Sequence, residues 1–229
     1  MKQKIILLHG ALGDASMFNG LIKLLEKDFK IFSFNFSGHA KKDFTDKNFS
    51  IQLFADELEE FILANNIGAA NIFGYSMGGY VVWWLARFKP TLVQFVFTLA
   101  TKLNWNEETS AKENRMLNAN KMEEKIPAYA LLLKERHGDY WKKTVTQTAE
   151  LILQLGKYHL VDDDFKRIKA RVHFSIGDKD TMVTKEETLH FQSLIEHSSY
   201  SVLENTQHAF EKVDDGVVAT EIVKVLHGN

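Results

Sequence analysis

Short, continuously apolar runs alternate with segments of helical periodicity along most of this chain. The apolar runs cover residues 4–9, 30–36, 71–75, 93–99, 172–176 and 200–203. Runs without polar interruption are typical of strands in a parallel sheet whose two faces are both covered. Strands that alternate with helices are joined by right-handed crossovers and form an α/β sheet. We therefore predict an α/β fold with a mostly parallel, open sheet that binds ligands beyond the carboxyl ends of its strands.

The segments between the predicted strands carry signals that begin and end helices. Ser50 precedes a helical pattern and is expected to cap its first turn, and Gly68 follows that pattern as a stop signal. Thr184 and Glu187 have the spacing of a capping box at the start of another helix. These signals place helices between the strands, as the alternating pattern requires.

One connection is far longer than the others. Roughly 70 residues separate the fourth predicted strand from the fifth, whereas such connections usually take about 2–6. Within this segment Pro127 is placed to open a helix, and a longer helical pattern ends at Gly156. We predict a helical cap of residues 102–167, inserted in a core domain of residues 1–101 and 168–229.

Composition narrows the classes of function. The chain has 229 residues, of which 45% are hydrophobic and 25% charged, as in a globular protein with a single core. Its net charge of −2 does not favour nucleic acid. The absence of cysteine excludes disulfides, thiolate zinc sites and cysteine nucleophiles. No nucleotide-binding or zinc-protease motif occurs, and Asp162–Asp164 is interpreted as an acidic helix start, so we expect no cofactor and no metal.

The apolar stretches do not indicate a membrane protein. The run near the N-terminus is too short for a signal peptide, and residues 80–100 are interrupted by charge. We expect a cytoplasmic monomer or homodimer that acts on a small molecule and binds no membrane.

The segment Gly74–Gly79 lies between a predicted strand and a predicted helix. It contains the pattern G-x-S-x-G, in which glycines allow a sharp turn that exposes the hydroxyl of Ser76. Ser76 would stand at a helix N-terminus, where backbone amides favour developing negative charge. The alternative is a glycine-rich turn without function. The strand–turn–helix context favours Ser76 as a nucleophile.

A serine nucleophile needs a base that accepts its proton. His208 follows the last predicted strand through a short loop, at a carboxyl strand end. His137 and His159 fall in the predicted cap and are able to line a pocket, but nothing in the sequence brings them to Ser76. We therefore predict His208 as the base.

An acid must orient that histidine and stabilise its charged form. Asp178 and Asp180 both follow the fifth predicted strand in the segment Gly177–Asp180. Either one is also able to cap a turn. The spacing alone does not distinguish the two carboxylates.

Backbone amides must bind the oxyanion of the tetrahedral intermediate. Met77, the residue after the nucleophile, is expected to supply one of them. The loop His9–Gly13 after the first strand, whose glycines permit a close approach, is expected to supply the other. We expect His9 itself to form hydrogen bonds within this loop.

Together these features resemble the α/β-hydrolase fold superfamily. The resemblance covers nearly the whole chain and rests on His9-Gly10, Ser37-Gly38-His39, Gly74–Gly79, Gly177–Asp180 and His208. It implies a sheet of the α/β-hydrolase type with an inserted helical cap, Asp180 as the acid, and Ala11 as the second oxyanion donor. Ser76 excludes the branch with an aspartate nucleophile. Two departures are the opening on the His-Gly strand, without the usual N-terminal hairpin, and Ala40 in place of a glycine.

Large apolar residues of the predicted cap suggest the nature of the substrate. Each is also explained by helix packing, but as a group they favour an apolar acyl or ring-bearing substrate. The predicted substrate-binding residues are Leu12, Trp105, Met116, Tyr129, Leu132 and Trp141.

Three functions are compatible with these residues. The first is a serine hydrolase that cleaves a carboxylic ester, or less favourably a thioester, of a small to medium apolar acyl group. The second is a C–C bond hydrolase or a lyase of the menaquinone-pathway type. The lyase branch commonly has an arginine after Gly78-Gly79, where this chain has Tyr80. The third is a ligand receptor without enzymatic activity on the same fold.

Overall fold

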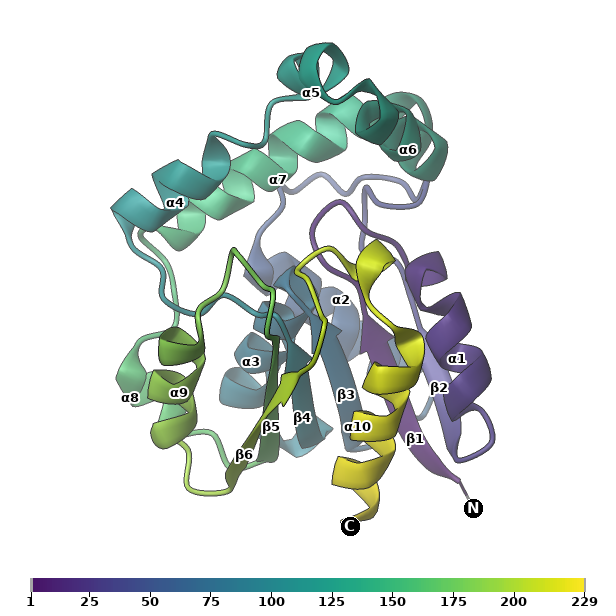
Figure 1. Ribbon diagram of the computed structural model, residues 1–229, viewed down its shortest axis with the longest axis vertical. Helices are drawn as coiled ribbons and strands as arrows, with labels where there is room; N and C mark the ends of the chain where they lie inside the picture. Colours follow the sequence, from purple (N-terminus) through teal and green to yellow (C-terminus); the bar gives the residue numbers. More distant parts are fainter. Residues whose placement is uncertain (1, 229) are drawn as a thin grey trace.

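A parallel sheet of six strands forms the centre of the molecule (Figure 1). The computed structural model describes residues 2–228, so the terminal residues of the predicted core domain, Met1 and Asn229, lie outside it. The strands are β1 (Gln3–Leu8), β2 (Phe29–Ser33), β3 (Ala70–Tyr75), β4 (Val93–Leu99), β5 (Arg171–Gly177) and β6 (Ser198–Leu203). Their order in the sheet is β2-β1-β3-β4-β5-β6, and all neighbouring pairs are parallel. The predicted α/β fold is confirmed.

The strand order places two loops side by side. The chain moves from β1 outward to β2 and then returns to pair β3 with the other edge of β1. Ligands of open α/β sheets bind at such a switch point. Leu8 of β1 pairs with Gly74 of β3, so the loop after β1 and the turn after β3 start next to each other.

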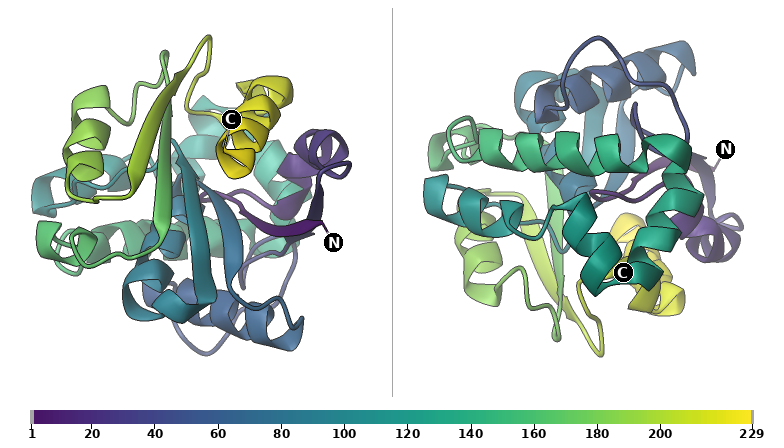
Figure 2. Two further views of the ribbon diagram at one scale, coloured as in Figure 1. Left: turned by 90° about the horizontal axis from the view of Figure 1, so that it is seen from below. Right: turned by 90° about the horizontal axis from the view of Figure 1, so that it is seen from above.

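Helices cover both faces of the sheet (Figures 1 and 2). One face carries α1 (Asn19–Leu25) and α10 (Asp215–His227), and the other carries α2 (Ile51–Ala64), α3 (Met77–Phe88) and α9 (Lys185–Ser193). A hydrophobic core lies on each face of the sheet, and side chains that alternate along each strand contribute to both cores. In β1, for example, Ile5 and Leu7 join the first core, whereas Ile6 and Leu8 join the second.

The long connection between β4 and β5 forms a helical segment. It contains α4 (Glu107–Asn114), α5 (Ala119–Lys125), α6 (Pro127–His137), α7 (Trp141–Leu155) and the short acidic-start helix α8 (Asp162–Phe165). Helices α4–α7 lie across the carboxyl ends of the strands (Figure 1, top; Figure 2, right). Short 3₁₀ helices cover Ala15–Phe18, Pro90–Leu92, Gly138–Tyr140 and Phe210–Lys212. Among the helices of residues 2–228, none has the length and apolar character needed to cross a bilayer.

Most of the predicted helix signals act as expected. The hydroxyl of Ser50 accepts a hydrogen bond from the Leu53 amide at 3.0 Å, and Pro127 is the first residue of α6. The prediction that Gly68 ends the preceding helix is wrong, because α2 ends at Ala64. Asn66 already has a left-handed backbone with φ of 50°, a conformation that asparagine tolerates and that a helix cannot continue through.

Candidate active site

Ser76 occupies the sharp turn between β3 and α3. Its backbone has φ of 51° and ψ of −119°, a region that residues other than glycine rarely adopt. The surrounding chain holds this conformation from both sides. The Ser76 amide donates to the Leu99 carbonyl at 2.9 Å, and the Thr101 hydroxyl donates to the Ser76 carbonyl at 3.2 Å. The turn presents the Ser76 side chain to a cavity above the sheet.

The glycines of this motif are needed because the backbone packs on itself. A Cβ atom on Gly74 would lie 2.5 Å from the Cα atom of Gly79. A Cβ atom on Gly78 would lie 2.5 Å from the carbonyl oxygens of Leu8 and His9. Both distances are far shorter than van der Waals contact, so the G-x-S-x-G pattern reflects how tightly this turn packs against β1.

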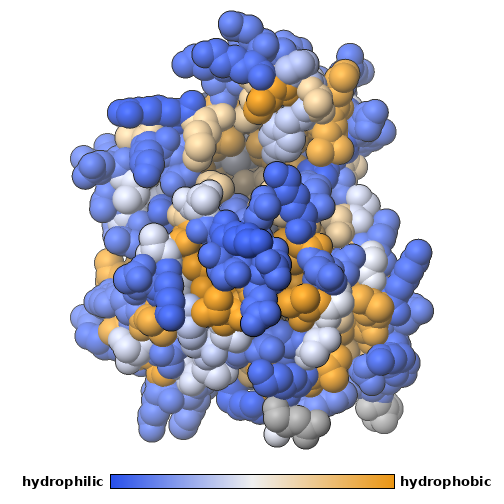
Figure 3. Space-filling view, in the orientation of Figure 1, coloured by the Kyte–Doolittle hydropathy of each residue, from blue (hydrophilic) through white to orange (hydrophobic). Residues whose placement is uncertain are grey.

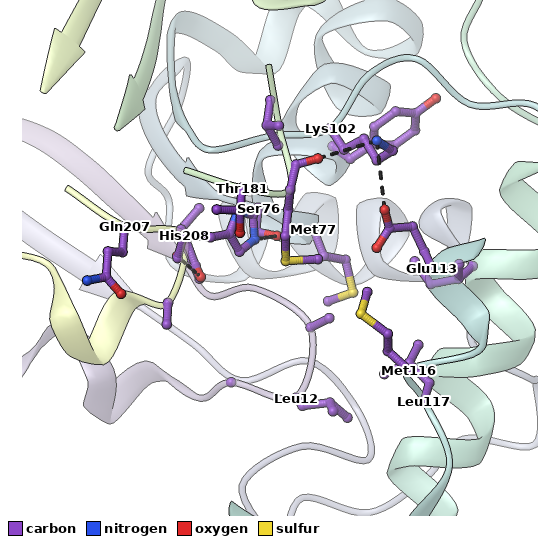
Figure 4. A pocket seen from close by; sticks show the side chains of 18 of the residues that line it. Leu12, Ser76, Met77, Lys102, Glu113, Met116, Leu117, Thr181, Gln207 and His208 are labelled. Atoms are coloured by element: carbon purple, nitrogen blue, oxygen red, sulfur yellow. Dashed lines mark hydrogen bonds and ion pairs between the residues drawn. The ribbon is translucent and has the colours of Figure 1, made fainter. Parts of the chain in front are cut away.

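His208 reaches Ser76 from the loop after β6. Its Nε2 atom lies 3.3 Å from the Ser76 Oγ atom, and its side chain is 15% exposed (Figure 4). The hydroxyl of Tyr75 donates to the His208 carbonyl at 2.6 Å and so anchors this loop to the residue before Ser76. The geometry allows Nε2 to accept the hydroxyl proton of Ser76.

Asp180 lies on the opposite side of the His208 ring. Its Oδ2 atom accepts from Nδ1 of His208 at 2.9 Å, and its Oδ1 atom accepts from the amides of Met182 at 2.8 Å and Val183 at 3.0 Å. The side chain is fully buried. Burial acts to raise the pKa of Asp180. The hydrogen bond from His208, the charge of His208 and the hydrogen bonds from the two amides together outweigh burial, so the pKa of Asp180 is lowered. The carboxylate therefore stays ionised beside the imidazole.

Asp178, the competing carboxylate, is exposed. Its Oδ1 atom accepts from the Thr206 amide at 3.0 Å, so it joins the turn after β5 to the loop after β6. The alternative that spacing left open thus resolves geometrically, since only Asp180 contacts His208.

The two residues expected to supply oxyanion donors, Ala11 and Met77, both line the cavity that Ser76 faces. Met77 is the first residue of α3, so its amide has no carbonyl partner within the helix. Ala11 follows Gly10 in the loop after β1 and lines the same cavity as Ser76. Gly10 allows this approach, because a Cβ atom there would lie 2.8 Å from the Tyr75 ring and 3.2 Å from the Ser76 Cβ atom.

His9 shapes this loop from inside the protein. Its Nε2 atom accepts from the Phe36 amide at 3.4 Å, so Nδ1 carries the proton and donates to the Gly10 carbonyl at 2.9 Å. Burial lowers the pKa of His9 to about 4, which keeps the ring neutral at pH 7. The expected hydrogen bonding of His9 within its loop is confirmed.

The cavity above Ser76 has a volume of about 690 Å³. Figure 3 shows the surface hollowed between the top of the molecule and its body, with apolar side chains around the hollow. The predicted residues Leu12, Trp105, Met116 and Tyr129 line the cavity. The chain has 6 methionines, and all except Met1, which lies outside the described residues, line it: Met17, Met77, Met116, Met122 and Met182.

Two predicted substrate-binding residues do not line this cavity. Trp141 is 4% exposed and packs in a separate core of the helical segment with Leu133 and Val145. Leu132, one position before Leu133 on α6, is half-buried and is also absent from the lining among residues 2–228. The cavity lining therefore gives no support to either assignment, because helical periodicity does not tell which face of a helix meets the cavity and which meets its neighbours.

The histidines of the helical segment serve its packing. His137 lies at the end of α6, where its Nε2 atom donates to the Leu12 carbonyl at 3.0 Å and its Nδ1 atom accepts from the Ala40 amide at 3.0 Å. It thereby joins α6 to the loops after β1 and β2. His159 bonds to the Leu155 carbonyl at 3.0 Å. Neither lines the cavity around Ser76.

Sequence reasoning missed much of the polar part of the cavity wall, which includes Arg136, Lys179, Thr181 and Glu211 besides Lys102, Glu113 and Gln207. Lys102 follows β4, and Glu113 lies on α4 among exposed charged neighbours. Gln207 precedes His208 on the other side of Ser76 (Figure 4). Lys102 and Glu113 are charged residues in a segment rich in charge, so no local signal marks them as cavity residues.

Comparison with known proteins identifies the family. A sequence model of the alpha/beta hydrolase fold family matches residues 4–131, more than half of the chain. The chain belongs to the α/β-hydrolase fold family. The order of Ser76, Asp180 and His208 along the chain is the order of nucleophile, acid and base in α/β-hydrolases.

Proteins named as hydrolases or esterases are among those that this chain resembles in sequence or in fold. A human protein named serine hydrolase-like protein is 31% identical over 101 residues, which are 43% of this chain and 50% of that protein. The match thus spans half the length of that curated relative. An enol-lactonase from Burkholderia xenovorans LB400 superposes with a TM-score of 0.79 at 18% identity, covering 99% of this chain and 92% of its own. A thermophilic esterase from Thermogutta terrifontis superposes with a TM-score of 0.80 at 17% identity, covering 100% of this chain and 90% of its own. At such identities the two structures show a shared α/β-hydrolase fold.

Proposed function

We propose that this protein is a serine hydrolase that cleaves a carboxylic ester of a small to medium apolar acyl group, with a thioester as the less favoured substrate. The observation that carries the proposal is the unbroken chain of contacts from Ser76 Oγ through His208 to the buried Asp180 at the floor of a cavity. A nucleophile, a base and an orienting acid in this arrangement suit acyl transfer.

Acylation follows from the positions of these groups. The Ser76 Oγ atom attacks the ester carbonyl carbon while its proton passes to Nε2 of His208. The carbonyl oxygen becomes an oxyanion that accepts hydrogen bonds from the Ala11 and Met77 amides. When the tetrahedral intermediate collapses, the bond to the alcohol oxygen breaks and the alcohol takes the proton from Nε2. Asp180 holds the imidazole in place and stabilises its positive charge meanwhile.

Deacylation repeats these steps with water. Water attacks the acyl carbon and gives a proton to Nε2 of His208, and the second oxyanion uses the same amides. Collapse breaks the bond to the Ser76 oxygen, which recovers the proton. The products are one carboxylic acid and one alcohol.

The lining of the cavity supports an apolar substrate arm. Cavities of about 300–1,000 Å³ suit small-molecule ligands, and this one has about 690 Å³. Its methionine side chains are flexible and polarisable, which lets one cavity adapt to acyl groups of different shape. We propose that residues 102–167 act as a cap that supplies much of this lining and shields the acyl-enzyme from bulk water.

A lyase acting on an acidic substrate receives less support. The position after Gly79 is Tyr80, whose hydroxyl accepts from the Leu160 amide at 2.9 Å. This side chain is buried and already engaged. It offers no positive charge to an acidic substrate.

The test is hydrolysis of p-nitrophenyl esters from acetate to decanoate by the wild type and by Ser76→Ala. A matched control is Ser193→Ala, which removes an exposed serine hydroxyl of α9. We expect activity in the wild type and the control but not in Ser76→Ala, with a broad optimum of chain length. Loss of labelling by a fluorophosphonate should accompany loss of activity. Ester hydrolysis that survives in Ser76→Ala, or its absence in all three proteins, would refute the proposal.

A further inference from the structure

One wall of this largely apolar cavity carries charge. Lys102 and Glu113 line the cavity (Figure 4), and Glu187, which is not part of the lining, lies close to Lys102. The Nζ atom of Lys102 is 3.9 Å from an oxygen of Glu113 and 3.9 Å from an oxygen of Glu187. The three side chains are only 18%, 11% and 8% exposed. Buried charges are costly unless they are well paired, so their presence here requires an explanation.

Glu187 has a structural role. Its Oε1 atom accepts from the amides of Leu103 at 2.6 Å and Asn104 at 2.7 Å. These bonds fix the backbone directly after Lys102, at the point where the chain leaves β4 for the helical segment. The carboxylate of Glu187 is therefore largely satisfied.

Glu113 and Lys102 keep unused hydrogen-bonding capacity. Within residues 2–228 the Glu113 carboxylate accepts no hydrogen bond, and its nearest cation is the Lys102 ammonium at 3.9 Å, beyond hydrogen-bond range. The Lys102 ammonium donates one long hydrogen bond, to the Met182 carbonyl at 3.4 Å. Both groups face the cavity, so both are able to bind a ligand there.

The charges of this wall select the kind of ligand group. A carboxylate that approaches Lys102 also meets Glu113 and Glu187, and an ammonium that approaches Glu113 meets Lys102. A neutral hydroxyl suits both groups, since its oxygen accepts a hydrogen bond from the Lys102 ammonium and its O–H donates one to the Glu113 carboxylate. An oxygen about 2.8 Å from each atom bridges a 3.9 Å gap as the apex of a triangle.

We propose that Lys102 and Glu113 bind an uncharged hydroxyl group in one arm of the ester, away from the scissile bond. This inference rests on the proposed function. It makes the two residues determinants of specificity, which select a hydroxylated ester over its alkyl analogue and over a carboxylated one.

The test compares esters that differ only at the far end. Methyl alkanoates from butanoate to decanoate are measured beside their ω-hydroxy and ω-carboxy analogues, and hexyl acetate beside ω-hydroxyhexyl acetate. The proteins are the wild type, Glu113→Gln and a control, Glu108→Gln, which makes the same change at an exposed position of α4 outside the cavity lining. The quantity compared is kcat/KM for each pair of substrates.

In the wild type we expect a hydroxyl in one of the two arms to raise kcat/KM about tenfold or more over the alkyl ester. Glu113→Gln should reduce this ratio and raise the relative rate of the ω-carboxy ester about tenfold, whereas Glu108→Gln should change neither. If Glu113 had only a structural role, Glu113→Gln would lower kcat/KM for all substrates by the same factor.

Equal rates for hydroxylated and alkyl esters in both arms would overturn this inference while leaving the proposed function intact. Selectivity that is unchanged in Glu113→Gln would overturn it in the same way. Absence of hydrolysis with every ester would overturn both proposals.

Discussion

Replacement of Ser76 by glycine is expected to stabilise the protein while it removes the proposed nucleophile. The left-handed backbone of Ser76, with φ of 51° and ψ of −119°, costs a residue with a Cβ atom about 1–3 kcal/mol. Glycine avoids that cost but loses about 0.4–1 kcal/mol through its greater freedom in the unfolded chain. The net gain of Ser76→Gly over Ser76→Ala is then about 1–2 kcal/mol. Ser76→Ala keeps the Cβ atom and so keeps the strain.

Thermal unfolding followed by circular dichroism measures this difference. For a chain of this size each kcal/mol shifts Tm by about 2–4 °C, so Ser76→Gly should melt several degrees above Ser76→Ala. The same pair of substitutions at Ser193, the last residue of helix α9, should give glycine no such gain, because the φ of Ser193 is not positive and glycine there only adds freedom to the unfolded chain. A Ser76→Gly protein that melts at or below Ser76→Ala would refute the view that this turn is strained.

Two further predictions concern charge. Asp180→Asn should lower kcat about a thousandfold or more, because the imidazole loses its ionised partner. The kcat of Asp178→Asn should stay near that of the wild type. Equal losses of kcat in steady-state kinetics of the two variants would contradict the assignment of Asp180. Burial lowers the pKa values of His9 and His137 from 6.5 to about 4. As pH falls through this range the unfolded chain binds protons that the folded histidines do not, so stability should decrease, by about 1–2 kcal/mol per histidine between pH 7 and pH 5. Urea unfolding at both pH values should show a smaller decrease in His137→Gln than in the exposed-site control His190→Gln, and equal decreases would count against burial as the cause.

Local patterns in the sequence were enough to predict the strands, the helical segment and the position of Ser76. Each of these depends on neighbours in the chain: continuous apolar runs for strands, Ser50 and Pro127 for helix starts, and Gly74 and Gly78 for the turn. Such signals act over a few residues, so they are readable without the fold. His208 was also predictable from the sequence, because a histidine just after a parallel strand must emerge at the same edge of the sheet as the serine.

The spacing of residues in the sequence did not distinguish Asp178 from Asp180, and only the tertiary structure shows which of them lies beside His208. The two carboxylates are two residues apart in one turn, and only the conformation of that turn sends one to His208 and the other to the Thr206 amide. The resemblance to known hydrolases pointed to Asp180, but the residues themselves did not.

The lining of the cavity was decided by tertiary structure alone. The sequence predicts helices at α6 and α7, but the rotation of each helix about its axis is set by packing against distant segments. That packing turns Trp141 into the interior of the helical segment and turns Glu113 toward Lys102. The sequence therefore did not show which apolar residues of these helices line the cavity, or that Lys102 and Glu113 do. The physical reason is that the residues next to a side chain along the chain do not indicate which distant residues it contacts in the fold.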